Sequence, residues 1–239
     1  MQSEFTIIIP VYNEAESLNR LFQKMQDYIF AAHKKSVVLF VNDGSTDESL
    51  KLIREQCTSN PSFKYISFDR NYGLSAAIKA GFDHVYTEWT GYIDADLQTD
   101  PMDFNLLFEH AENQDLVTGV RRLRKDSFSK KISSKLANKI RRFFTHDGMD
   151  DTGCPLKIIR TDYAKRIPMF SGLHRFLPAM ILLQKGKIKQ VTVKHFPRMA
   201  GQSKFTLWNR LLGPLQDCFA YLWMKRKYIN YRIAEDGSK

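Results

Sequence analysis

The sequence predicts an α/β fold in which helices flank both faces of an open, mostly parallel sheet. Two observations support this prediction. Apolar, β-branched runs alternate with amphipathic helical segments, and polar residues collect where those runs end. The 239 residues are enough to bury a sizeable core, and 43% hydrophobic with 26% charged residues is ordinary for a globular protein. This composition argues against disorder, collagen or coiled coil for the bulk of the chain.

The first half of the chain contains five strand-like runs separated by segments with helical periodicity. We expect Asn13 to cap the first helix and Asp47 the second, since such side chains accept hydrogen bonds from the free N–H groups of a first turn. Pro101 is expected at the start of the last helix. The predicted strands span 5–11, 37–41, 63–68, 89–93 and 115–120, and the predicted helices span 15–30, 47–60, 73–86 and 101–113.

The second half is less regular, and two amphipathic helices are predicted in it. Apolar residues recur every three or four positions over 128–144 with six Lys and Arg between them, which indicates a helix packed on the core with a basic outer face. A helix over 205–228 is rich in Trp, Leu and Phe and ends in Lys225-Arg-Lys227. Such a helix either lies in a membrane interface or packs on the domain or a partner chain.

Charge divides the chain into two unlike halves. Residues 1–120 have 9 basic and 18 acidic residues, whereas 121–239 have 27 and 8, for a total of +10. The basic half suggests contact with a polyanion: nucleic acid, a phosphorylated ligand or a membrane face. A solvated basic surface is the alternative. Nucleic acid is not expected, because the chain lacks a recognised binding motif and its acidic loops would repel phosphates.

Several kinds of protein are excluded by what the sequence lacks. The three cysteines are far apart, and the six histidines have no metal-ligand spacing, so neither a disulfide framework nor a zinc site is expected. No signal peptide or spanning helix is expected, so we predict a soluble or peripheral chain in a reducing compartment. The P-loop, the dinucleotide-binding glycine motif and the Gly-x-Ser-x-Gly motif are absent.

The most informative polar cluster follows the fourth predicted strand. Asp94 and Asp96 would repel each other, and a hard divalent cation would remove that repulsion, with Gln98 offering a further oxygen. We therefore predict Mg²⁺ or Mn²⁺ bridging to substrate phosphates; a solvated acidic turn is the alternative. Acidic loops with a cation, on a parallel sheet without a glycine fingerprint, point to a sugar nucleotide.

Eight motifs in order along residues 5–205 resemble those of the inverting family 2 glycosyltransferases, which have the GT-A fold. Five of them resemble the polyprenyl-phosphate subgroup, which includes dolichol-phosphate mannose synthase and undecaprenyl-phosphate sugar transferases. The family motifs are Ile9-Pro-Val-Tyr-Asn-Glu14, Val41-Asn-Asp-Gly-Ser-Thr-Asp47 and Asp94-Ala-Asp-Leu-Gln98. The subgroup motifs are Asp69-Arg-Asn-Tyr-Gly73, Gly119-Val-Arg121, Asp151-Thr-Gly-Cys154, His174-Arg-Phe-Leu-Pro178 and Pro197-Arg-Met-Ala-Gly-Gln-Ser-Lys204.

The resemblance implies a role for each residue at a matching position. Nucleotide contacts fall on Pro10, Tyr12, Glu14, Asp43 and Asp94, and the metal site on Asp94, Asp96 and Gln98. Catalytic positions are Asp94, Asp96, Arg121, Arg198 and Lys204, the last three holding donor or acceptor phosphates. Acceptor-phosphate contacts fall on Ser134, Lys135 and Arg175. The family often has a second acid where this chain has Asn42, and Asp43 retains the other.

The implied activity is metal-dependent, inverting transfer of sugar from a UDP-sugar or GDP-mannose to a polyprenyl phosphate. The implied place is the cytoplasmic face of the membrane, reached peripherally or through a membrane partner protein. Residues 1–204 would form the catalytic domain (1–120 for nucleotide sugar and metal, 121–204 for the acceptor), and 205–239 a membrane-proximal tail. One alternative is transfer to a saccharide hydroxyl with Asp150 or Asp151 as base. Another is a catalytically silent homologue.

Overall fold

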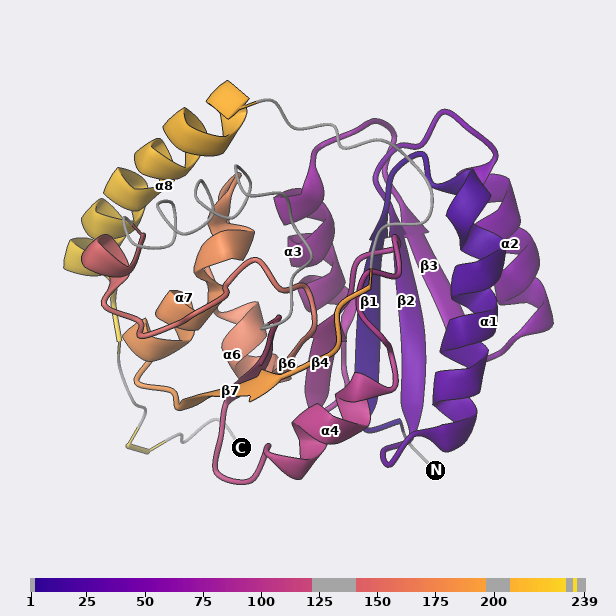
Figure 1. Cartoon of the computed structure of the whole chain (residues 1–239), viewed down its shortest axis with the longest axis horizontal. Helices are drawn as coiled ribbons and strands as arrows, with labels where there is room; N and C mark the ends of the chain where they lie inside the picture. The colour runs from indigo at the N-terminus through magenta and orange to yellow at the C-terminus, as the bar shows by residue number, and fades with distance from the viewer. Residues whose placement is uncertain (1–2, 122–140, 197–206, 231–233, 236–239) are drawn as a thin grey trace.

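The computed structural model describes residues 3–121, 141–196, 207–230 and 234–235, and over 207–214 it describes the backbone alone. Within these ranges a seven-stranded sheet in the order β3-β2-β1-β4-β6-β5-β7 lies between two layers of helices (Figure 1). Its strands are β1 (Phe5–Val11), β2 (Ser36–Asn42), β3 (Phe63–Ser67), β4 (Trp89–Tyr92), β5 (Leu116–Val120), β6 (Lys157–Arg160) and β7 (Ile188–Thr192). The mostly parallel α/β sheet that the sequence predicts is confirmed.

The helices divide between the two faces of the sheet. Helices α1, α2 and α4 cover one face, and α3, α6, α7, α8 and the short 3₁₀ helix η1 cover the other. Their bounds are α1 (Ala15–Ala31), α2 (Ser49–Ser59), α3 (Leu74–His84), α4 (Asp103–Glu109), α6 (Thr161–Lys165), η1 (Leu173–Phe176), α7 (Leu177–Leu183) and α8 (Leu207–Lys227).

Strand β1 shows why the sheet has two cores. Ile7 and Ile9 point into the core under α1, whereas Ile8 points into the core under α3, and all three have no exposed surface. Successive side chains on a strand face opposite sides, so an unbroken apolar run is needed when both faces are covered. This run is the pattern from which the sequence predicts a central strand.

Two strands of the second half were not predicted, and one of them changes the topology. Strand β6 lies between β4 and β5 and runs antiparallel to both, while β7 pairs in parallel with β5. Because β5 is antiparallel to β6, it runs parallel to β4, and its carboxyl end lies at the same sheet edge as those of β1 to β4. The predicted gathering of five polar loops at one edge is therefore confirmed.

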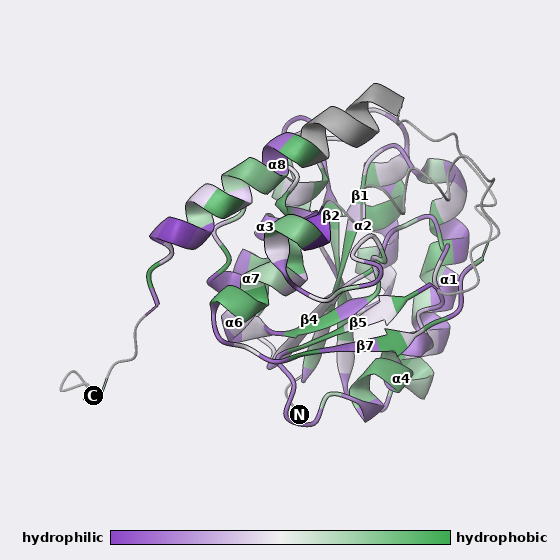
Figure 2. Cartoon of the chain, turned by 60° about the vertical axis from the view of Figure 1, so that its left-hand side comes forward, coloured by the Kyte–Doolittle hydropathy of each residue, from purple (hydrophilic) through white to green (hydrophobic). Residues whose placement is uncertain are grey.

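Helix α8 confirms the helix predicted over 205–228 and packs on the domain along one face. Cys218 and Tyr221 are 2% and 1% exposed, and the Tyr221 ring stacks on Phe176 with centroids 5.8 Å apart. Figure 2 shows α8 along the outside of the molecule, with apolar and polar residues alternating on it. Among the residues described, no helix is long and apolar enough to cross a membrane.

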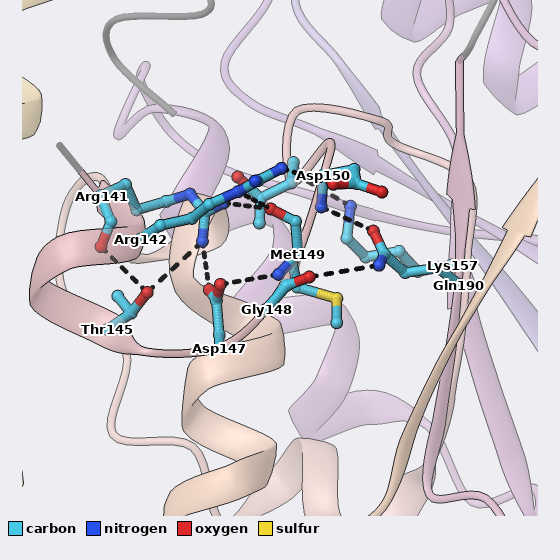
Figure 3. A network of polar contacts seen from close by, with 10 residues as sticks. Arg141, Arg142, Thr145, Asp147, Gly148, Met149, Asp150, Lys157 and Gln190 are labelled. Carbon is cyan, nitrogen blue, oxygen red and sulfur yellow. Dashed lines mark hydrogen bonds and ion pairs between the residues drawn. The ribbon is translucent and has the colours of Figure 1, made fainter. Parts of the chain in front are cut away.

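The predicted helix over 128–144 lies mostly outside the described residues, so its basic outer face stays a prediction, but one of its six basic residues is not on such a face. Residues 141–145 are helical, but Arg141 is buried and forms an ion pair with Asp147, with side-chain exposures of 7% and 0%. The Arg141 guanidinium also donates to the Met149 carbonyl at 2.9 Å (Figure 3). The alternation of Lys and Arg along the sequence could not reveal this, since the partner lies in the following loop.

Candidate active site

The loops after β1 and β2 are joined by hydrogen bonds at the carboxyl edge of the sheet. The side-chain oxygen of Asn13 accepts from the N–H of Thr46 at 2.8 Å, and the N–H of Asn13 donates to Ser45 Oγ at 3.0 Å. The N–H of Glu14 donates to Ser49 Oγ at 3.0 Å. These contacts fix the loop that places Tyr12 and Glu14, two predicted nucleotide contacts, both partly exposed. Pro10, another predicted nucleotide contact, lies on β1 itself and is also partly exposed.

Asp47 accounts for the start of two helices, and this corrects the predicted role of Asn13. The Asp47 carboxylate accepts from the N–H of Ala15 at 3.1 Å and from the N–H of Ser49 at 3.0 Å, the first residues of α1 and α2. The capping position of α1 is Glu14, and Asn13 has a left-handed φ of 53°. Asn13 is not the cap, because an acid from the neighbouring loop accepts from the first turn. Asp47 accepts a hydrogen bond from the first turn of α2, as predicted, but the capping position of that helix is Glu48.

Asp43, also predicted to contact the nucleotide, supports the loop after β3. Its carboxylate is 3% exposed and accepts from the N–H of Tyr72 at 2.7 Å, the N–H of Gly73 at 2.9 Å and the side-chain amide of Asn71 at 2.9 Å. Burial raises the pKa of Asp43, and the two backbone hydrogen bonds act in the opposite direction. The structure therefore gives Asp43 a role in shaping the 71–73 loop.

The acidic turn after β4 places the predicted metal ligands at the middle of the same edge. Asp94, Asp96 and Gln98 are all partly exposed. One oxygen of Asp96 accepts from the N–H of Gln98 at 3.1 Å, and the Gln98 carbonyl accepts from the N–H of Phe196 at 2.9 Å. Leu97 has a left-handed φ of 54°, which makes the turn tight.

This donor set fits a hard divalent cation that shares its coordination with a substrate. The side chains of Asp94 and Asp96 end in oxygen, as does that of Gln98, and Mg²⁺ is usually bound through one or two carboxylates together with phosphates. Among the described residues no group of three or more His, Cys, Asp or Glu could hold a metal. A cation held by these three side chains would need its remaining ligands from water or from a phosphate.

Arg121, at the end of β5, forms a two-pronged ion pair with Asp151. Its Nε and Nη2 donate to the two carboxylate oxygens at 2.7 and 2.9 Å, and its backbone N–H donates at 3.3 Å. The side chains are 8% and 10% exposed. Burial alone would lower the pKa of Arg121, but the hydrogen bonds and charge of Asp151 outweigh burial and raise it, with a smaller contribution from Asp94. The guanidinium is thus held as a fixed positive charge on the same edge as the acidic turn.

Lys157 is a residue of this region that no sequence motif singles out. It begins β6, has no exposed surface, and donates from Nζ to the carbonyl oxygens of Thr152 and Cys154. In the sequence it appears as one lysine at the head of an apolar run. Only the fold reveals that it lies under the turn that follows Asp151.

The predicted acceptor residue Arg175 lies where α8 meets the domain. Its Nη1 is 3.4 Å from a carboxylate oxygen of Asp217 on α8. The neighbouring His174 has Nδ1 2.8 Å from Ser75 Oγ, which also accepts from the N–H of Gly172 at 3.0 Å. Burial first, and then the charges of Arg175 and Lys157, lower the pKa of His174 to about 3.

We expect the lowered pKa of His174 to destabilise the fold in acid. Below pH 6.5 the unfolded chain binds a proton on His174 that the folded chain does not, so the free energy of unfolding falls from about pH 6.5 towards about pH 3. The slope from this one group is at most about 1.4 kcal/mol per pH unit. Urea unfolding at several pH values should show a flatter dependence for His174→Asn. Equal slopes for both proteins would contradict the assignment.

The remaining predicted residues are not all testable. Ser134, Lys135, Arg198 and Lys204 lie outside the described residues, so their predicted roles stay predictions. Of the two acids considered as bases for a saccharide acceptor, Asp150 is exposed and pairs with Arg142 at 2.5 Å. The other, Asp151, binds Arg121.

Comparison with known proteins finds relatives of this chain among sugar transferases. The family model described as "Glycosyl transferase family 2" matches residues 6–167. A dodecaprenyl-phosphate galacturonate synthase of Rhizobium johnstonii is 29% identical over 93% of this chain and 68% of its own length. An undecaprenyl-phosphate 4-deoxy-4-formamido-L-arabinose transferase of Edwardsiella ictaluri is 32% identical over 84% of this chain. This chain spans 63% of the length of that second relative.

Solved structures share the fold at low sequence identity. Glucosyl-3-phosphoglycerate synthase of Mycobacterium tuberculosis superimposes with a TM-score of 0.72 at 13% identity, over 95% of this chain and 81% of that one. A mannosyltransferase of Pyrobaculum calidifontis, solved with GDP-Man and Mn²⁺, gives a TM-score of 0.61 at 17% identity, over 92% and 64%. These likenesses confirm the GT-A fold. With a family model covering residues 6–167, this chain belongs to glycosyl transferase family 2.

Proposed function

We propose that this protein transfers a sugar, with inversion, from a nucleotide-diphosphate sugar to a polyprenyl phosphate at the cytoplasmic face of a membrane. The observation that carries the proposal is the edge of the sheet where Asp94 and Asp96 lie with the fixed charge of Arg121. The names of both curated relatives, which contain a polyprenyl phosphate and a sugar, support the acceptor class. UDP-sugars and GDP-mannose are the expected donors.

The reaction exchanges one bond at the anomeric carbon for another. The acceptor phosphate oxygen forms the new bond from the side opposite the diphosphate, and the electron pair of the broken bond leaves on the nucleoside diphosphate. Mg²⁺ or Mn²⁺ bound by Asp94, Asp96 and Gln98 would act as a Lewis acid toward the departing diphosphate. Arg121, held by Asp151, supplies a positive charge on the same edge without needing to reorganise.

The carboxylates considered as catalytic bases are engaged by arginines, which favours an acceptor that needs no base. The acceptor phosphate is mostly ionised near neutral pH, with a second pKa of about 6, so it needs little help from a base. A hydroxyl acceptor would need a carboxylate to remove its proton. Both oxygens of Asp151 accept hydrogen bonds from Arg121, and Asp150 pairs with Arg142, which favours the phosphate.

Peripheral membrane contact is supported by the outer face of α8. Leu215, Phe219 and Trp223 recur every four residues away from Cys218 and Tyr221, and they are 37%, 58% and 68% exposed. One edge of this stripe meets the domain, since the Phe219 ring contacts Phe144 with centroids 5.5 Å apart. The helix ends in Lys225, Arg226 and Lys227. An apolar stripe followed by cations suits an interface with anionic headgroups, to which each basic residue adds about 1 kcal/mol.

We expect Phe219→Ala/Trp223→Ala to weaken binding to phosphatidylglycerol vesicles by more than tenfold. Removing each ring forfeits about 1.5 kcal/mol or more of apolar burial. Co-sedimentation measures the change, and Phe30→Ala is the matched control because it removes a ring that is 95% exposed on α1. Unchanged binding of the double variant would rule out this face as the membrane contact.

A thermal-shift screen tests the donor site. We expect UDP or GDP, and the matching sugar nucleotide, to raise the unfolding temperature only when Mn²⁺ is present. Ligand at a hundredfold excess over Kd stabilises the native state by about 2.7 kcal/mol. The absence of a shift with every nucleotide would argue against the proposed donor site and favour a silent homologue.

A further inference from the structure

Lys157 lies between the ends of β4 and β5, the two strands that lead to the acidic turn and to Arg121. It forms the last residue pair of the β4–β6 ladder, with Tyr92, and the last pair of the β5–β6 ladder, with Thr118. Two residues beyond Tyr92 the chain reaches Asp94, and three residues beyond Thr118 it reaches Arg121. Lys157 therefore lies in the sheet next to the strand that leads into the acidic turn and next to the strand that leads to Arg121.

The direct contacts of the buried Lys157 ammonium are with neutral groups, although the charges of Asp151, Arg121 and Asp94 also act on it. It donates to the carbonyl oxygens of Thr152, at 3.3 Å, and of Cys154, and it lies 5.3 Å from the centroid of the Tyr92 ring. A fully buried ammonium is costly, whereas an unbranched apolar side chain of similar length would fill the same space without that cost. Packing alone therefore does not explain a lysine here.

The two carbonyl contacts hold the turn to which Asp151 belongs. Asp151 immediately precedes Thr152, and its carboxylate grips Arg121 through two hydrogen bonds of 2.7 and 2.9 Å. On the other side of the turn, the N–H of Asp150 donates to Gln190 Oε1 at 2.7 Å. The residues on either side of Asp151 are thus held in place: Asp150 by Gln190, and Thr152 by Lys157. Burial lowers the pKa of Lys157, while the negative charges of Asp151 and Asp94 act in the opposite direction.

We propose that Lys157 is a positioning residue of the transfer reaction: its buried charge holds the turn 152–154 so that Asp151 presents Arg121 to the departing diphosphate. This inference rests on the proposed function. Lys157 touches neither donor nor acceptor, because it has no exposed surface, and it acts through the arginine. Apart from Asp94, the predicted nucleotide contacts lie on β1 or follow β1 and β2, on the far side of β4, so the effect should fall mainly on turnover and little on donor binding.

The test compares three variants of the turn with one control. Lys157→Met removes the charge and keeps the length, whereas Lys157→Arg keeps the charge. Gly153→Ala disturbs the ion pair of Arg121 and Asp151 directly, since an added Cβ would lie 3.1 Å from Nη2 of Arg121. Ile159→Val is the control: it trims a 1% exposed side chain of the same strand.

Two rates are measured for each protein at a temperature where all are folded: transfer of sugar to undecaprenyl phosphate, and release of nucleoside diphosphate with water as acceptor. We expect Lys157→Met to lower kcat for both reactions at least tenfold, with donor KM changed less than threefold. Lys157→Arg should recover part of this loss, Gly153→Ala should lower kcat threefold or more, and Ile159→Val should change it less than twofold.

The outcomes separate this inference from the proposed function. A Lys157→Met protein with kcat within threefold of the parent, or with the loss entirely in donor KM, overturns the positioning role. A parent protein that releases nucleoside diphosphate but leaves undecaprenyl phosphate unmodified overturns the acceptor assignment alone. Release from none of the donors contradicts both. If Lys157→Arg does not fold, the split between kcat and donor KM in Lys157→Met still decides, with Ile159→Val as the control for a changed core side chain.

Discussion

Replacing Asp96 with Asn is expected to lower kcat by about 10²–10³, because a charged ligand of the proposed cation is lost while the turn is preserved. The asparagine oxygen can still accept the hydrogen bond that the N–H of Gln98 donates at 3.1 Å, so the loop should keep its shape. The negative charge that the cation needs is gone. A loss of this size corresponds to about 3–4 kcal/mol of transition-state stabilisation.

The measurement is the rate of sugar transfer over a range of Mn²⁺ concentrations. Half-activation of Asp96→Asn should need more metal than half-activation of the parent. Asp100→Asn is the matched control, because Asp100 lies nearby and its carboxylate accepts from the N–H of Met102 at 3.0 Å. Near-normal turnover of Asp96→Asn with unchanged metal dependence would remove Asp96 from the metal site.

The largest effect on stability is expected from the buried pair of Arg141 and Asp147. Asp147→Asn leaves the Arg141 charge uncompensated in a site where the two side chains are 7% and 0% exposed. Breaking a buried ion pair by removing one partner typically costs about 3–5 kcal/mol. The asparagine can still accept from the N–H of Met149, as Asp147 does at 3.0 Å, so the loss should come from the charge. Urea unfolding measures the difference.

A double-mutant cycle gives the control. Arg141→Met/Asp147→Asn has no unpaired buried charge, and we expect it to be more stable than either single variant. In this variant the Met149 carbonyl keeps a donor, since Nε of Arg142 bonds to it at 2.7 Å. The neighbouring exposed pair of Arg142 and Asp150 should contribute no more than about 1 kcal/mol. Additive losses in the cycle would show that the two charges are not coupled.

The predictable part of the fold is the part governed by short-range pattern. The largely apolar run at residues 5–11 predicts a strand covered on both faces, and β1 confirms it residue for residue. The helix predicted over 101–113 has shorter observed bounds, Asp103–Glu109, as is usual for helix ends. Strand β6 is four residues long and begins with a buried lysine, so no periodicity marked it.

The candidate site was predictable in position but not in its internal contacts. Polar residues at strand ends located the edge, because parallel strands bring their carboxyl ends together. The sequence could not show that Asp43 is engaged by the 71–73 loop, or that Arg121 is gripped by an acid 30 residues away. Such pairings depend on tertiary contacts between loops, and no spacing rule encodes them.

Direct observation of sugar transfer to a polyprenyl phosphate tests the central claim. The purified protein is incubated with Mn²⁺, undecaprenyl phosphate and each of the labelled donors UDP-glucose, UDP-N-acetylglucosamine and GDP-mannose, and the lipid fraction is then analysed. The account predicts that label from one donor enters the lipid as a sugar phosphodiester, that chelation of the metal prevents this, and that Asp96→Asn reduces it. A lipid fraction that stays unlabelled with every donor, or lipid labelling that is unaffected by chelation and by Asp96→Asn, would contradict it.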